Sequence, residues 1–214
     1  MKIKQVLAEF VGSAILAISI VGSGIMGARL SGDGGLALLI NALGTAIGLA
    51  VAIQLVGKIS GAHLNPVVTL VMVLKNNISK SLALLYVFAQ TAGAIGGVIA
   101  SNYIFGLKVI QSSTQNREGA NLFVSEIIAT AILLWIILIN LNNFEKLSTY
   151  VPLWIFGGII ITSSTSFANP AVTIGRSFTN SATGIAAGSI WLFVIAQVIG
   201  ALLGMSAMKY FRNA

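Results

Sequence analysis

Long apolar segments alternate with short polar ones along the whole chain. The apolar segments cover approximately residues 5–28, 36–57, 82–105, 121–141, 150–163 and 185–208. A helix needs about 20 mainly apolar residues to cross the hydrocarbon core of a bilayer. The fifth segment is shorter and is interrupted by Gly157 and Gly158, but we count it with the others. The pattern therefore predicts six membrane-spanning helices.

Two further apolar stretches are too short to span a membrane, and each begins with an Asn-Pro pair. Asn65-Pro66-Val67 opens a stretch that ends at Leu74, and Asn169-Pro170-Ala171 opens one that reaches Arg176. Asn is favoured at a helix N-cap, where its oxygen accepts backbone N–H groups, and Pro at the first helical position has no N–H to leave unpaired. Two half-helices at matching places of a membrane protein point to a site near the bilayer midplane, which their positive N-terminal ends face.

An internal repeat relates the two halves of the chain. Glu9-x-x-x-Ser13-Ala14-Ile15-Leu16 matches Glu126-x-x-x-Thr130-Ala131-Ile132-Leu133 at an offset of 117 positions. A polar stretch from about 108 to 120 separates the halves and is predicted to be an external loop. Because each half holds three spans, the second half must be inverted. We predict one all-α channel domain, residues 1–214, built from inverted repeats at about 1–107 and 120–214.

Composition supports an integral membrane protein. The 214 residues are 57% hydrophobic and 8% charged, with a mean hydropathy of +0.96, which excludes an ordinary water-soluble domain. With no Cys and a single His, no metal centre or cofactor site is indicated. The N-terminal segment begins like a signal peptide, but Glu9 interrupts it, and we expect a retained first span.

The net charge of +7 comes from basic residues that stand singly between apolar segments. This arrangement fits membrane topology better than nucleic-acid binding, because it forms no basic cluster. The predicted spans place most of them on the side of both termini, which we expect to be cytoplasmic: Lys2, Lys4, Lys58, Lys75, Lys80, Lys146, Lys209 and Arg212. Four lie on the other side, and we expect the first three to be solvated loop charges: Arg29, Lys108, Arg117 and Arg176.

The segment Ser60-Gly61-Ala62-His63-Leu64-Asn65-Pro66-Val67, the second Asn-Pro-Ala and the Glu in the first span of each half resemble the major intrinsic protein family, the aquaporins and glycerol facilitators. The resemblance covers essentially the whole chain. It implies a homotetramer in a lipid bilayer, with one pore per subunit that passes water and small neutral solutes and excludes ions and protons. It implies neither a cofactor nor catalysis. A bacterial-type inner membrane is the expected location.

Several residues have candidate roles. If capping occupies the side-chain oxygens of Asn65 and Asn169, their amide groups can donate hydrogen bonds into the pore. Glu9 and Glu126 are either proton-relay groups or acceptors for the backbone of the re-entrant segments, and we favour the second role. His63 is either a proton switch or a packing group; the family resemblance implies that it lies beside the pore and does not gate it.

The filter region departs from the usual family pattern. Most aquaporins have Arg directly after the second Asn-Pro-Ala, whereas this chain has Val172, as in a similar bacterial branch. The resemblance puts Thr45, Gly157 and Ser166 at the other filter positions, which predicts a wide, uncharged constriction. Arg176, four residues further on, either reaches back into the filter or caps the half-helix.

The sequence therefore predicts a passive channel for water and small uncharged solutes such as glycerol, urea or metalloid hydroxides. One alternative is a water-selective aquaporin in which Arg176 restores the narrow filter. A secondary transporter with broken helices and inverted repeats is a more distant alternative, because the spans offer almost no coupling groups.

Overall fold

The computed structural model describes residues 2–212, and this range contains helices and connecting segments without a strand. Six helices are long and apolar enough to span a membrane, as predicted: α1 (Lys2–Leu30), α2 (Gly34–Ser60), α4 (Lys80–Ile104), α5 (Ala120–Ile139), α6 (Phe144–Ile161) and α8 (Ile190–Arg212). Two short helices lie between them, α3 (Pro66–Leu74) and α7 (Pro170–Gly175). Two 3₁₀ turns, Arg176–Phe178 and Ala187–Ser189, complete the structure.

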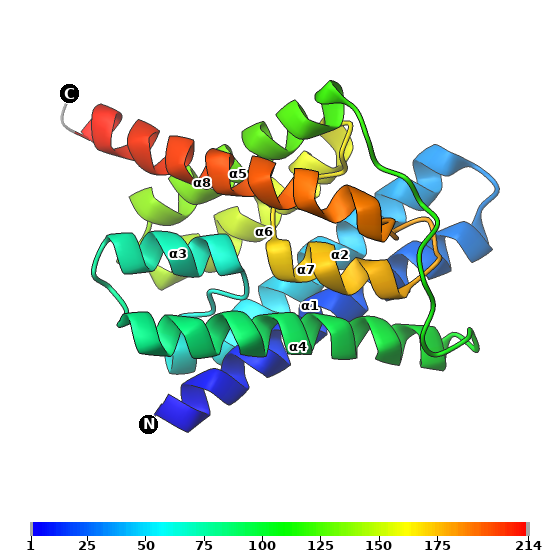
Figure 1. The fold of residues 1–214 in the computed structure, drawn as a ribbon, viewed down its shortest axis with the longest axis horizontal. Coiled ribbons are helices and arrows are strands. Elements are labelled where there is room, and N and C mark those ends of the chain that lie inside the picture. The colour runs from blue at the N-terminus through cyan, green and yellow to red at the C-terminus, as the bar shows by residue number, and fades with distance from the viewer. Residues whose placement is uncertain (1, 213–214) are drawn as a thin grey trace.

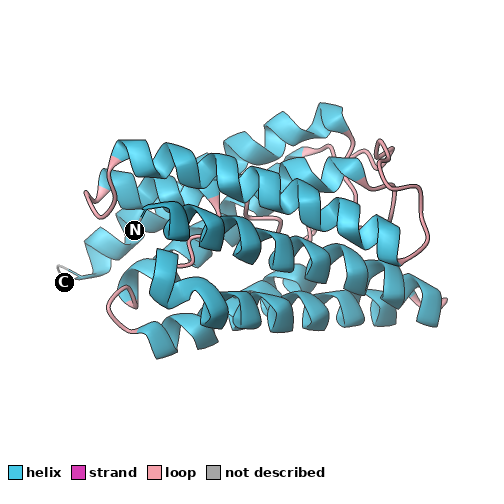
Figure 2. Cartoon of the chain, turned by 90° about the horizontal axis from the view of Figure 1, so that it is seen from below, coloured by secondary structure: helices cyan, strands magenta, loops and turns pink. Residues whose placement is uncertain are grey.

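The long helices form a bundle with connecting loops at its two ends (Figure 2). The start of α1 and the end of α8 lie at the same end of the bundle (Figure 1). The short helices start near the middle, and α3 extends toward the end that holds the termini whereas α7 extends the opposite way (Figure 1). The chain therefore places two helix N-termini tip to tip inside the bundle.

Both short helices begin where the Asn-Pro pairs predict. The Asn65 side chain accepts a hydrogen bond from Val67 N, and the Asn169 side chain accepts from Ala171 N and Val172 N. Pro occupies the first helical position in each case. The same chemistry thus starts both half-helices.

Several helix boundaries differ from the prediction, and three of them have a visible cause. Helix α6 begins at Phe144, because the Asn143 side chain caps its first turn, and it contains Pro152. Helix α8 begins only at Ile190, because the segment before it pairs with the polar loop through Ala186 N. Helix α7 ends at Gly175 and tightens into a 3₁₀ turn.

Glycines bring the paired helices α1/α4 and α5/α8 into close contact. A methyl group at Gly93 would collide with the backbone carbonyl of Phe10, and one at Gly204 would collide with that of Ala131. In a bilayer, where no hydrophobic force drives helices together, such close backbone approach lets van der Waals contact hold them. In both halves of the chain, a glycine of one helix therefore lies directly against a backbone carbonyl of its partner helix.

Candidate pore

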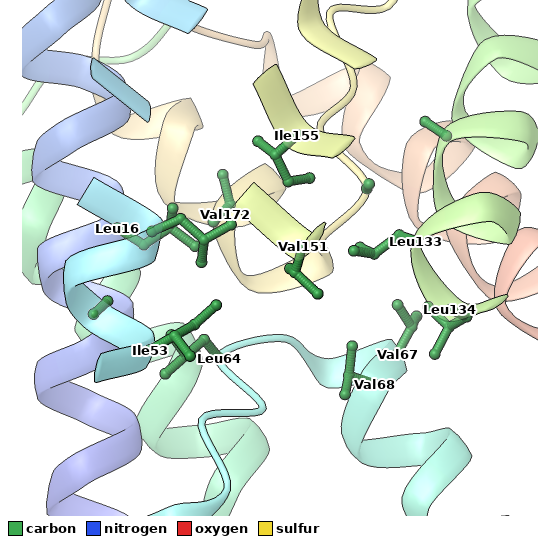
Figure 3. Close-up of a cluster of buried hydrophobic side chains, with 14 of the residues drawn as sticks. Leu16, Ile53, Leu64, Val67, Val68, Leu133, Leu134, Val151, Ile155 and Val172 are labelled. Atoms are coloured by element: carbon green, nitrogen blue, oxygen red, sulfur yellow. The ribbon is translucent and has the colours of Figure 1, made fainter. Parts of the chain in front are cut away.

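A cavity of about 470 Å³ passes the point where the two short helices meet. Its wall is mainly apolar and is contributed by helices from both halves: Leu16, Ile20, Leu49, Ile53, Val68, Leu133, Val151, Ile155, Ile159 and Val172. Side chains of Leu16, Ile53, Leu133, Val151 and Val172 converge on this space (Figure 3). The same residues belong to the largest buried apolar cluster, so the centre of the molecule combines a core with a cavity.

A smaller set of polar residues interrupts the apolar wall. It includes residues from α2, both re-entrant segments and the end of α7: Asn41, Thr45, His63, Asn65, Ser166, Asn169 and Arg176. None of the described residues that line the cavity is acidic. Any solute in the cavity therefore meets hydrogen-bonding groups at a few fixed points.

The tips of the short helices are joined by a reciprocal pair of hydrogen bonds. Asn65 Nδ2 donates to the Ala168 carbonyl at 2.7 Å, and Asn169 Nδ2 donates to the Leu64 carbonyl at 2.7 Å. A side-chain amide has two N–H groups, so each Asn keeps a second donor after this bond. Both Asn residues line the cavity, which makes the second donors available to a passing oxygen.

Glu9 holds the first re-entrant segment through both carboxylate oxygens. Oε1 accepts from Ser60 Oγ at 2.6 Å and from His63 N at 3.0 Å. Oε2 accepts from Leu64 N and from Gln90 Nε2, each at 2.7 Å. All four acceptor contacts go to structural partners, as the scaffold interpretation requires.

Glu126 repeats this arrangement in the second half. Its Oε1 accepts from Ser164 Oγ at 2.6 Å and from Phe167 N at 2.9 Å. Its Oε2 accepts from Ala168 N at 2.9 Å and from Gln197 Nε2 at 2.7 Å. Both carboxylates are fully buried, so these bonds replace water for groups that are otherwise costly to bury.

The segments held by the glutamates adopt unusual backbone conformations. Ala62 and Leu64 have φ values of +46° and +50°, and Ser166 and Ala168 have +47° and +45°. Left-handed conformations cost L-residues about 1–2 kcal/mol each. Non-helical backbone at membrane depth is tolerated where it lines a cavity or is buried in protein. The two glutamates therefore hold a strained backbone against the cavity.

His63 lines the cavity and belongs to the re-entrant segment that Glu9 holds. Its Nδ1 lies 3.1 Å from Thr69 Oγ1, and its ring meets the edge of Tyr86 with ring centroids 5.3 Å apart. Tyr86 in turn donates its hydroxyl to the Ser60 carbonyl at 2.9 Å. The His63 ring therefore lies between Thr69 and Tyr86 at the wall of the cavity.

Three of the four small filter candidates line the cavity, and the fourth does not. Thr45, Ser166 and Val172 are lining residues. Gly157 was expected there by counting along the family pattern, but it lies outside the lining, and Ile159 lines the cavity instead. Counting residues does not define the rotation of α6 about its axis.

The Arg176 side chain lines the cavity, and its hydrogen bond goes to a loop carbonyl rather than to the last carbonyls of α7. The residue is the C-cap of α7 and is only 5% exposed. Its Nε donates to the Thr183 carbonyl, and its guanidinium carbon lies 3.3 Å from the ring centroid of Phe167. These contacts hold the guanidinium at one end of the cavity, one helical turn beyond Val172.

Arg117 was expected to be a solvated loop charge, but it is half-buried beside this cluster. Its Nε donates to the Gly184 carbonyl at 2.7 Å, and its Nη2 donates to the Ala182 carbonyl at 2.9 Å. Burial lowers the pKa of Arg117, while the charge of Glu126 opposes that shift. Arg117 thus binds the carbonyls of Ala182 and Gly184, which flank Thr183. The Thr183 carbonyl in turn accepts the hydrogen bond from Arg176.

Asn41 is a cavity-lining residue that the sequence analysis did not single out. Its Nδ2 donates to the Ile20 carbonyl at 2.7 Å and to Ser23 Oγ at 3.0 Å. Among the described residues, no donor reaches its Oδ1. The available signal was a polar side chain one helical turn before Thr45 in an otherwise apolar span. Asn41 and Thr45 therefore present polar groups on the same face of α2.

This architecture defines a multi-pass membrane channel with a central pore. The family model described as "Major intrinsic protein" matches residues 1–166. The chain is 38% identical over 208 residues to an aquaglyceroporin of Rhizobium meliloti, AqpS, covering 97% of this chain and 89% of the relative. The chain belongs to the major intrinsic protein family, whose members are membrane channels.

Two further comparisons agree with this assignment. A glycerol uptake facilitator protein of Streptococcus pneumoniae is 28% identical over 233 residues, covering 97% of this chain and 99% of the relative. The crystal structure of an aquaglyceroporin from Plasmodium falciparum superposes with a TM-score of 0.79 at 25% identity, covering 96% of this chain and 95% of that one. The likeness therefore extends over the whole fold.

Proposed function

We propose that this channel passes water together with small uncharged solutes such as glycerol, urea or metalloid hydroxides. The observation that carries the proposal is a cavity whose apolar wall holds hydrogen-bonding groups at a few points and includes no carboxylate among the described lining residues. Such a wall suits molecules that carry both hydroxyl groups and a hydrocarbon side. The channel is proposed to work passively, without catalysis or a cofactor.

The paired Asn tips are proposed to exclude protons. The free N–H donors of Asn65 and Asn169 would bind the oxygen of a central water and turn its hydrogens away along the pore. A water so oriented cannot accept a proton from its neighbours in a chain. The positive N-terminal end of α3, worth up to about half an elementary charge, would add a barrier to cations.

Discrimination among neutral solutes is proposed to occur at the end of the pore that contains Arg176. Asn41 Oδ1 offers an acceptor there, and the guanidinium of Arg176 offers donors. Together with Val172, Asn41 and Arg176 form a site that accepts and donates hydrogen bonds without a carboxylate among the described lining residues.

Two alternatives make different predictions. A water-selective pore requires Arg176, together with Ile159, to narrow the filter to about one water molecule. A secondary transporter requires a group that couples transport to protons or ions, but Glu9 and Glu126 already bind four structural donors each. Water flux without glycerol entry would support the first alternative, and saturable, proton-linked uptake would support the second.

Stopped-flow light scattering of proteoliposomes tests the proposal. After a jump in external glycerol, we expect the native protein to give rapid shrinkage followed by fast reswelling, at a rate that is linear in the glycerol gradient. Arg176→Ala should retain glycerol entry, because removing a side chain widens the pore. Arg29→Ala is a matched control, since Arg29 is exposed and does not line the cavity. Absence of reswelling in the native protein, with reswelling in Arg176→Ala, would contradict the proposed solute range.

We further propose that the chain forms a homotetramer in the inner membrane, with both termini cytoplasmic and inverted repeats at about 1–107 and 120–214. The matching hydrogen bonds around Glu9 and Glu126 support the repeats. Family membership supports the tetramer. The excess of basic residues at the end that holds both termini supports the orientation.

A further inference from the structure

A second pocket, of about 440 Å³, lies at the end of the bundle that holds both chain termini. Three basic residues from three different elements line it: Lys75 follows α3, Lys146 is in the first turn of α6, and Arg212 ends α8. None of the described residues that line it is acidic. Within the described part of the chain, the wall of the pocket therefore carries positive charge only.

One side of the same pocket is aromatic and apolar. Trp135 stacks on Phe211 with ring centroids 5.1 Å apart and an interplanar angle of 14°. Ile139 is 67% exposed and Phe211 is 59% exposed, although both line the pocket. Trp is enriched at the boundary between hydrocarbon and headgroups. The pocket thus joins a cationic part to an exposed apolar part at the polar ends of spanning helices.

We propose that this pocket binds the headgroup of an anionic phospholipid. The phosphate would lie among Lys75, Lys146 and Arg212, and the acyl chains would run along Ile139 and Phe211. Basic pockets between spanning helices on the cytoplasmic side are suited to anionic headgroups, and each Lys or Arg near the surface contributes attraction to anionic lipid. A free phosphate ion would use the cations only and would leave the apolar side uncovered, so a lipid fits the whole pocket better.

The site adjoins the pore. Leu141 and Asn142 line both this pocket and the central cavity. A bound headgroup would therefore contact the segment that forms one mouth of the channel. The inference depends on the chain spanning a membrane and not on which solute it conducts.

Native mass spectrometry of the purified, delipidated protein tests the site. Phosphatidylglycerol and phosphatidylcholine with identical acyl chains are titrated, and bound lipids are counted. We expect the native protein to bind phosphatidylglycerol at least about tenfold more tightly. The pocket variant Lys75→Gln/Lys146→Gln/Arg212→Gln should lose this preference, because three attractive charges are removed.

A matched control removes the same charge at the same end of the bundle. Lys2, Lys58 and Lys80 do not line the pocket, and the variant Lys2→Gln/Lys58→Gln/Lys80→Gln should retain the preference within about twofold. Equal loss in both triple variants would overturn the proposal in favour of general surface attraction. Equal binding of the two lipids to the native protein would overturn it as well.

A separate arm distinguishes a lipid from a free anion. Inorganic phosphate at millimolar concentration should not displace phosphatidylglycerol, and its displacement of the lipid would mean that the pocket is an anion site.

If the triple variant does not fold, Lys146→Gln and Arg212→Gln are tested singly, since both side chains are exposed. Unchanged lipid preference in both single variants would then count against the site. Glycerol reswelling by the native protein is recorded in parallel, so that failure of the lipid site and failure of the proposed function remain distinguishable.

Discussion

Glu9 and Glu126 each connect a spanning helix to a re-entrant segment through four hydrogen bonds. Glu126→Ala would leave two backbone N–H groups, Ser164 and Gln197 without their acceptor. Each buried donor left without its acceptor costs about 1–3 kcal/mol, and four donors lose the Glu126 carboxylate. We expect a fall in Tm of roughly 6–12 °C or more, measured by tryptophan fluorescence in detergent.

Glu118→Ala is the control for this prediction, because it removes a carboxylate from an exposed loop position. It should leave the Tm unchanged. If Glu126→Ala were as stable as the native protein but showed altered proton-linked transport, the scaffold role would be wrong and the relay role would be favoured.

At the scale of helices, the close crossing of α1 and α4 depends on Gly93. A side chain there would meet the backbone carbonyl of Phe10, which cannot move away without shifting α1. We expect Gly93→Ala to destabilise the protein by about 1–3 kcal/mol. Gly96→Ala in the same helix is the control, because the nearest atom to an added methyl group is the far end of the Phe10 ring at 4.0 Å. Thermal unfolding measures both; an equal effect would show that helix propensity, rather than the crossing, decides.

For the whole molecule, the orientation in the membrane follows from the distribution of charge. The chain has no Cys, so single cysteines can be introduced at exposed positions without competing thiols. We expect a membrane-impermeant maleimide to label Ser112→Cys on intact cells, and to label Lys80→Cys only after permeabilisation. The reverse pattern would mean that the termini face outward.

Much of the architecture was predictable because membrane insertion imposes strict rules on sequence. Spans require long apolar segments, and Asn-Pro pairs start helices through local hydrogen bonds. Helix ends were less predictable: the start of α8 depended on pairing with a distant loop. Boundaries set by contacts between distant segments have no local signature.

The sequence by itself determined the six spans, the two half-helices, the capping of their tips by Asn65 and Asn169, and the family. Each of these follows from local periodicity or from residues a few positions apart. The tertiary structure decided which side chains line the pore. Ile159 lines the cavity whereas Gly157 does not, and Asn41 is a further lining residue. Arg176 lies both at the end of α7 and on the wall of the cavity. These outcomes depend on helix rotation and on contacts such as that with Thr183, which only the packed bundle defines.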